Sequence, residues 1–213
     1  MIMKKILGIV VLGLCWFSSV YSSEELNNYQ IGKYKFGESL TKYFPKNTID
    51  QYKSCQLPGG DRFCTLSMLK DNTTGVFDAV QFIFDQDDDN YRIHSLKGDI
   101  HFSKWNECQK EQELAINFYK SRFGNIIKQI SDDRAILQTY LEKPNFVSSI
   151  TFYFNNDAGG QIGCYSVSNE TFIKYGFTPK PTNIYLTMSL SSKDFVSYHN
   201  KAGVTKEYFK KTN

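Results

Sequence analysis

The chain has 213 residues, with 25 Lys and Arg against 22 Asp and Glu, and its formal net charge is +3. So balanced a charge provides no broad basic surface, and we therefore expect no nucleic-acid partner. The length is enough for one well-buried domain. Aromatic and turn residues are spread evenly along the chain, so no break in composition divides it.

The beginning of the chain has the three parts of a secretory signal peptide. Lys4 and Lys5 precede an apolar run over residues 6–17, and small residues follow it. The run is too short to span a bilayer, and Ser22 is an acceptable last residue before cleavage. We therefore predict export to the periplasm or outside the cell, with no transmembrane segment in the mature chain. Without the two lysines, 23 basic residues remain against 22 acidic ones.

Cleavage at this place predicts a signal peptide at 1–22 and a single exported domain at 23–213. The alternative is a lipid anchor on Cys15, as in bacterial lipoproteins. Such signals require a small residue where Leu14 stands, so the sequence favours an exported chain without lipid.

The pattern of apolar residues predicts short strands separated by polar turns. The expected strands are 31–36, 63–69, 76–84, 91–96, 135–141, 149–154, 161–167 and 184–190. One or two helical turns are expected over 39–44, where Pro45 stops them. Ser191 or Ser192 is expected to cap a short helix that continues through Tyr198.

One long helix is predicted at about 106–123. Asn106 is the expected N-cap, with Gln109 three residues later, and Gly124 is positioned to end the helix. An apolar stripe with helical spacing follows the cap: Leu114, Ala115, Phe118, Tyr119 and Phe123.

The strands alternate apolar and polar residues instead of being apolar throughout. In 184–190, for example, Leu186 and Met188 alternate with Tyr185 and Thr187. Such alternation is typical of antiparallel sheets with one face on the core and one in water. The predicted fold is therefore α+β: a single domain with a mostly antiparallel β-sheet, the long helix packed on one face, and two disulfides.

Four cysteines follow the predicted signal: Cys55, Cys64, Cys108 and Cys164. An even number in an exported chain predicts disulfides, and four cysteines allow three connectivities. Cys55 and Cys64 are equidistant from Gly59-Gly60, so a hairpin that turns at these glycines would place the two cysteines opposite each other. They would form a non-hydrogen-bonded pair of the ladder, and the α-carbons of the two strands approach most closely at such pairs. Pro58 can shift this turn.

The symmetric pair makes Cys55–Cys64 the preferred bridge and leaves Cys108 with Cys164. A free Cys108 at the start of a helix would instead be a nucleophile candidate, because a helix N-terminus favours the thiolate. The even cysteine count favours the disulfide.

Asp85, Asp87 and Asp89 stand at the first, third and fifth places of a calcium loop. The match then fails, because Asn90 stands at the glycine position and Leu96 at that of the terminal glutamate. These carboxylates are therefore a weak metal candidate on a solvated turn. No cofactor-binding loop, H-E-x-x-H or paired C-x-x-C motif is present in the sequence, so we expect no cofactor.

The strand pattern places Tyr153, Tyr165 and Tyr185 on or beside a wet sheet face. Tyrosine-rich faces bind proteins and glycans, although cross-strand packing also explains such residues. The sequence therefore favours a non-enzymatic binding or inhibitory module whose partner is an envelope or extracellular protein or a glycan.

The alternative function is an exported hydrolase. Its site would consist of carboxylates and of His94 and His101, brought together only by the fold. Convergent titratable groups in a pocket would favour the enzyme, and a flat aromatic sheet face would favour the binding module.

Overall fold

The computed structural model describes residues 26–55, 57, 61–132, 146–166 and 183–201. The predicted signal peptide, the predicted strand 135–141 and the predicted turn at Gly59-Gly60 lie outside these residues.

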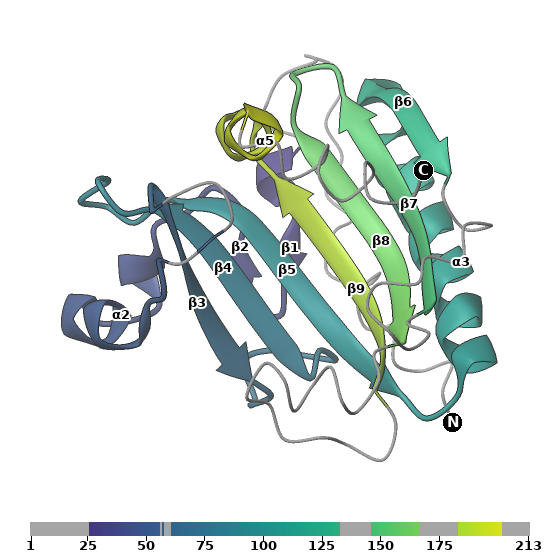
Figure 1. Cartoon of the computed structure of the whole chain (residues 1–213), viewed down its shortest axis with the longest axis horizontal. Coiled ribbons are helices and arrows are strands. Elements are labelled where there is room, and N and C mark those ends of the chain that lie inside the picture. Colours follow the sequence, from purple (N-terminus) through teal and green to yellow (C-terminus); the bar gives the residue numbers. More distant parts are fainter. Residues whose placement is uncertain (1–25, 56, 58–60, 133–145, 167–182, 202–213) are drawn as a thin grey trace.

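The centre of the molecule is a seven-stranded antiparallel sheet (Figure 1). Its strands are β3 (Phe63–Leu69), β4 (Ala79–Asp85), β5 (Ile93–Phe102), β6 (Ile127–Asp132), β7 (Phe146–Phe154), β8 (Gly159–Ser166) and β9 (Ile184–Ser191). Their spatial order is β3-β4-β5-β9-β8-β7-β6. Two three-stranded meanders, β3–β5 and β6–β8, are thus joined by β9, which pairs with both in the middle of the sheet.

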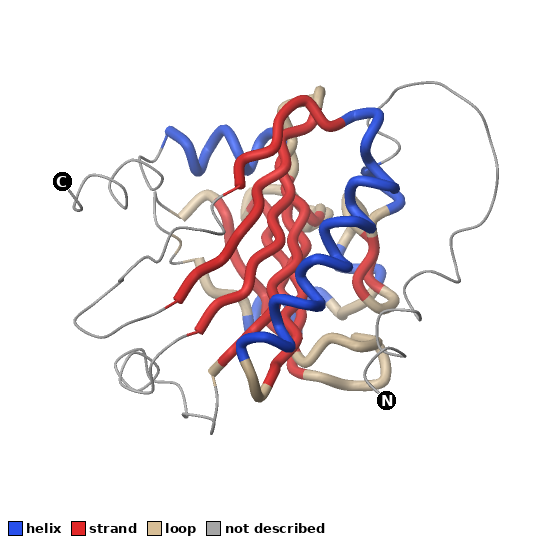
Figure 2. Tube along the Cα trace, turned by 90° about the vertical axis from the view of Figure 1, so that its right-hand side faces the viewer, coloured by secondary structure: helices blue, strands red, loops and turns tan. Residues whose placement is uncertain are grey.

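Helices lie on both sides of this sheet. The longest is α3 (Trp105–Phe123); α2 (Lys46–Tyr52) and α5 (Lys193–Lys201) are shorter. A small hairpin of β1 (Gln30–Ile31) and β2 (Tyr34–Lys35) lies on the same side as α3 (Figure 1). Single 3₁₀ turns occupy Leu26–Asn28, Leu40–Lys42 and Gly124–Ile126. Figure 2 shows α3 and α5 on opposite sides of the sheet.

The core lies between the sheet and α3. Tyr119 of α3 is fully buried, and its ring centroid is 5.3 Å from that of Phe152 on β7. Gln112 is buried as well, and its Nε2 donates to the backbone carbonyl of Ser148 at 2.7 Å. An amide that replaces its water with such a partner avoids the cost of an unsatisfied buried group. Apolar burial and this bond therefore fix α3 on the sheet, and the predicted fold class is confirmed.

The long helix begins one residue earlier than predicted. Its N-cap is Lys104, which makes no side-chain capping bond, and Asn106 is an exposed residue of the first turn. Trp105 packs against the core, which explains why the helix already starts there. Leu114 was assigned to the apolar stripe but is 40% exposed; Gln112 and Ile116 are buried instead.

The N-terminal part differs most from the sequence prediction. The expected strand 31–36 is broken into β1 and β2 by a two-residue turn, where Gly32 has a φ of +57°. Glycine adopts this left-handed conformation without strain. Pro45 ends the helical turn as predicted but also stands at the N-cap of α2, which the prediction missed. Proline is compatible with a helix start because it supplies no N–H there.

Both predicted disulfides are present. Cys55 joins Cys64 with α-carbons 4.0 Å apart, and Cys108 joins Cys164 with α-carbons 6.0 Å apart. Ser54 and Thr65 exchange both backbone hydrogen bonds, at 2.9 and 2.7 Å. The next pair, Cys55 and Cys64, is therefore the non-hydrogen-bonded one, as the spacing predicts. The second bridge ties α3 to β8 across the core.

Candidate binding face of the sheet

The face of the sheet opposite α3 carries mostly polar side chains, and we call it the polar face. Strand registers and alternation assign it these residues: Gln81 of β4; Ser95, Lys97, Asp99 and His101 of β5; Tyr185, Thr187, Ser189 and Ser191 of β9; Gln161, Gly163 and Tyr165 of β8; and Ser149, Thr151 and Tyr153 of β7. Among the described elements, only α5 lies over this face, at one end (Figures 1 and 2).

The structure brings together two of the three predicted tyrosines. Tyr165 of β8 and Tyr185 of β9 stand directly opposite each other in the ladder. Tyr153 pairs with Gly159, six residues along β8 from Tyr165, so it lies about 20 Å away at a rise of about 3.3 Å per residue. The side chain of Tyr153 is 39% exposed, whereas the paired tyrosines are half-buried.

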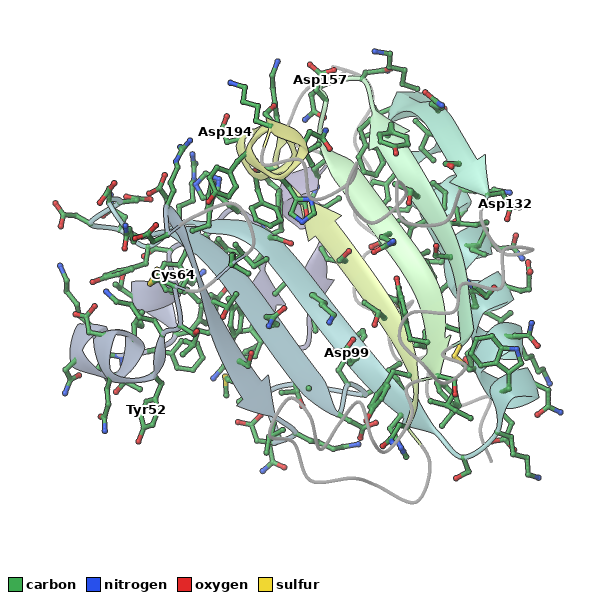
Figure 3. The ribbon with its side chains drawn as sticks, in the orientation of Figure 1. Tyr52, Cys64, Asp99, Asp132, Asp157 and Asp194 are labelled. Atoms are coloured by element: carbon green, nitrogen blue, oxygen red, sulfur yellow. A yellow bond between two sulfur atoms is a disulfide. The ribbon has the colours of Figure 1, made fainter. Side chains whose placement is uncertain are left out.

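A charged network lies beside the tyrosine pair. Thr187 Oγ1 donates to Asp99 Oδ1 at 2.6 Å, and Lys97 Nζ lies 3.3 Å from Asp99 Oδ2. Asp99 projects from β5 on the viewer's side of the sheet in Figure 3. These contacts hold Asp99 in one position on the pleated surface, because a charge-assisted hydrogen bond is shorter and stronger than a neutral one.

Aromatic contacts order the same end of the polar face. The rings of His101 and Tyr185 meet edge to face with centroids 5.3 Å apart. The ring of Tyr165 lies over Gly163, since a β-carbon built there would be 2.7 Å from its Cε2. Burial, and then the nearby Asp99 carboxylate, raise the pKa of Tyr185. Its hydroxyl therefore stays protonated at neutral pH.

We call this group the tyrosine-pair cluster. Its members are Lys97, Asp99, His101, Gly163, Tyr165, Tyr185 and Thr187. It combines two aromatic rings with a cation, a carboxylate and hydroxyl groups. A protein or glycan ligand requires both apolar contact and hydrogen bonds of this kind.

The two histidines of the hydrolase alternative lie at opposite ends of the same strand. His101 belongs to the tyrosine-pair cluster, whereas His94 lies seven residues earlier on β5, roughly 20 Å away. There His94 Nδ1 lies 3.0 Å from Ser192 Oγ, under α5. The structure therefore does not bring these histidines to one site.

The predicted metal candidates form hydrogen bonds and ion pairs in and around the turn between β4 and β5. Asp85 accepts a hydrogen bond from Arg62 Nε at 2.8 Å and another from the backbone N–H of Asp87 at 3.0 Å. Asp89 is highly exposed and lies 3.7 Å from Lys46 Nζ. Across the described ranges, no three His, Cys, Asp or Glu side chains gather as a metal site would require.

The sequence reasoning missed Lys97, Asp99 and Thr187 as members of the site. The predicted strand 91–96 stopped before Lys97 and Asp99, because Gly98 and Asp99 are typical turn residues. Thr187 lay within the predicted strand 184–190, but its partner Asp99 was not expected in a strand. Gly98 lies within β5 for a packing reason: a β-carbon there would be 2.4 Å from the ring of Phe77. The alternation of residues 95–101 was the signal that could have revealed Lys97 and Asp99.

The chain matches no protein-family model, no curated protein and no solved structure. Within the part of the chain that the structure describes, no helix combines the length and the apolar character that crossing a membrane requires.

Proposed function

We propose that this protein is an exported binding module without catalytic activity, and that the tyrosine-pair cluster binds an envelope or extracellular protein or a glycan. The observation that carries the proposal is the direct pairing of Tyr165 with Tyr185 beside the Asp99 network. Aromatic residues flanked by ordered polar groups are the usual centre of a binding surface.

The rigidity of the scaffold supports a binding role. The tyrosine pair lies on two central strands, and Cys164, next to Tyr165, is bonded to α3. A surface that is already ordered loses little conformational entropy when a ligand binds. The two disulfides are also compatible with the oxidising environment that export implies.

The experiment measures binding of the purified mature protein in two separate arms. One arm uses a panel of defined oligosaccharides, and the other uses fractionated envelope and secreted proteins. We expect Tyr185→Ala and Tyr165→Ala each to reduce the affinity for the ligand by about 30-fold, because residues at the centre of an interface contribute most of the binding energy. The arm in which this loss appears identifies the ligand class.

Tyr52→Ala is the matched control, because Tyr52 is 65% exposed and lies on α2, away from the polar face (Figure 3). It should leave affinity within about twofold of the unmodified protein. Equal losses for Tyr52 and the paired tyrosines would contradict the proposal. A hydrolytic activity that disappears on changing His101 would replace it with the enzyme alternative.

A further inference from the structure

Among the described residues, the helix α5 contacts β3, β5 and the turn between β7 and β8, where Lys193 Nζ lies 2.9 Å from Asp157 Oδ2. It has nine residues, none of them buried, and only Ser192 separates it from β9. An isolated helix of this length is unstable in water. The folded state of α5 therefore depends on its contact with the sheet.

Phe63 of β3 is the centre of that contact. Its ring centroid lies 5.2 Å from that of Phe195 and 5.0 Å from that of Tyr198, both on α5. The buried hydroxyl of Tyr198 has no hydrogen-bond partner among the described residues. Such a buried, unpaired hydroxyl is unfavourable, and this penalty is removed when α5 moves into water.

His94 lies beneath α5 and takes part in the same contact. Its ring meets Phe63 at 5.4 Å, and the backbone N–H of Ser192 donates to its carbonyl at 2.7 Å. On α5 itself, His199 lies 5.8 Å from Phe195, centroid to centroid. Both imidazoles are half-buried.

The charged groups around His94 come from each neighbouring element. Asp194 of α5, Asp85 of β4 and Asp88 of the following turn favour its charged form, and Arg92 opposes it. Burial outweighs the carboxylates and lowers the pKa of His94. Protonation in place would therefore cost free energy.

The surroundings of His199 are more apolar. Burial lowers its pKa. It packs against Phe195, whose other neighbour Phe63 has Arg62 on its ring, with Cζ 4.9 Å from the centroid. Arg62 is in turn paired with Asp85 at 2.8 Å. The cost of charging His199 in place therefore comes from its burial.

We propose that α5 is an acid-released helix, held on the polar face by the neutral imidazoles of His94 and His199 and detached when they are protonated. The detached state takes up protons more readily than the attached one, so its population rises as pH falls below the ordinary imidazole range near 6.5. Above that range the helix stays attached. Detachment would uncover Phe63 and extend the polar face.

Hydrogen exchange of the full mature protein at pH 7.5 and 5.0 tests this proposal. After correction for intrinsic exchange rates, we expect protection of residues 193–201 to fall about fivefold or more at the lower pH. Protection in α3 should stay unchanged. Equal protection of α5 at both pH values, or a parallel loss in α3, would overturn the proposal.

Two substitutions identify the groups responsible, and a third is the control. His94→Gln and His199→Gln remove titration and keep a polar side chain, so each should reduce the pH response and together they should abolish it. His101→Gln is the matched control, because His101 lies on the same strand at the other end of the polar face. A pH response that persists in the double variant would contradict the proposal, as would its loss in the control. If His94→Gln does not fold, His199→Gln alone still decides whether an α5 imidazole contributes.

Discussion

The two faces of the central sheet are made by alternate residues of the same strands, yet they are organised differently. On the core face, Phe152 and Leu190 are fully buried against α3 and the N-terminal segment. On the polar face, one residue further along β7, Tyr153 is 39% exposed. The core face determines stability, and the polar face is therefore able to vary its chemistry at small cost to the fold.

The largest expected contrast between the faces is at these adjacent positions of β7. Phe152→Ala should reduce the free energy of unfolding by about 4 kcal/mol, because it leaves a cavity beside Tyr119. Tyr153→Ala should cost less than about 1 kcal/mol. Urea denaturation of both variants measures the difference. Similar losses would show that Tyr153 is part of the packed core.

The two disulfides provide a second comparison, because only the Cys108–Cys164 bridge crosses the core. Replacing Cys108 and Cys164 by Ala removes a loop with a sequence separation of 56 and should cost about 4 kcal/mol. Replacing Cys55 and Cys64, separated by 9, should cost about 3 kcal/mol. The same denaturation experiment ranks them, and the reverse order would mean that unfolded-state loop entropy does not control the effect.

A glycine on each face provides a third contrast. Gly98→Ala should cost about 2 kcal/mol, since its β-carbon would meet the buried ring of Phe77 at 2.4 Å. Gly163→Ala should change stability by less than about 1 kcal/mol, because the half-buried ring of Tyr165 is able to move away. Thermal unfolding gives both values.

The Gly163→Ala variant should nevertheless weaken ligand binding, because it displaces a ring of the tyrosine-pair cluster. Unchanged affinity together with a displaced Tyr165 would remove that tyrosine from the binding site.

The smallest expected effect concerns the network on the polar face. Thr187→Val removes the hydrogen bond to Asp99 and should cost about 1 kcal/mol, because Lys97 still pairs with the carboxylate. Ser189→Ala, two residues along the same strand and face, is the control and should be nearly neutral. Chemical denaturation compares the two, and equal values would show that the Asp99 bond contributes no net stability.

Most strands and the long helix could be predicted because local patterns encode them. Strand 63–69 and the end of the helix at Phe123 are found as predicted. The errors arose where contacts distant in sequence decide the conformation. Gly98 is kept in a strand by Phe77, and α2, which starts directly after Pro45, is held on the core through the buried Ile49.

The candidate site was predicted only in part, because it too depends on contacts between residues distant in sequence. Alternation correctly assigned Tyr165 and Tyr185 to one face. It provided no information about which strands are neighbours, so it revealed neither the pairing of the two tyrosines nor the distance to Tyr153. It also left open whether His94 and His101 converge.

The sequence by itself determined the alternation of the strands, the long helix, the two disulfide pairs and the presence of one wet sheet face. These features depend on residue spacing, which acts locally along the chain. Only the tertiary structure decided that β9 lies between the two meanders, that Asp99 and Thr187 meet beside the tyrosine pair, and that α5 covers His94. These relations depend on which apolar surfaces are buried against each other, and that is a property of the whole folded chain.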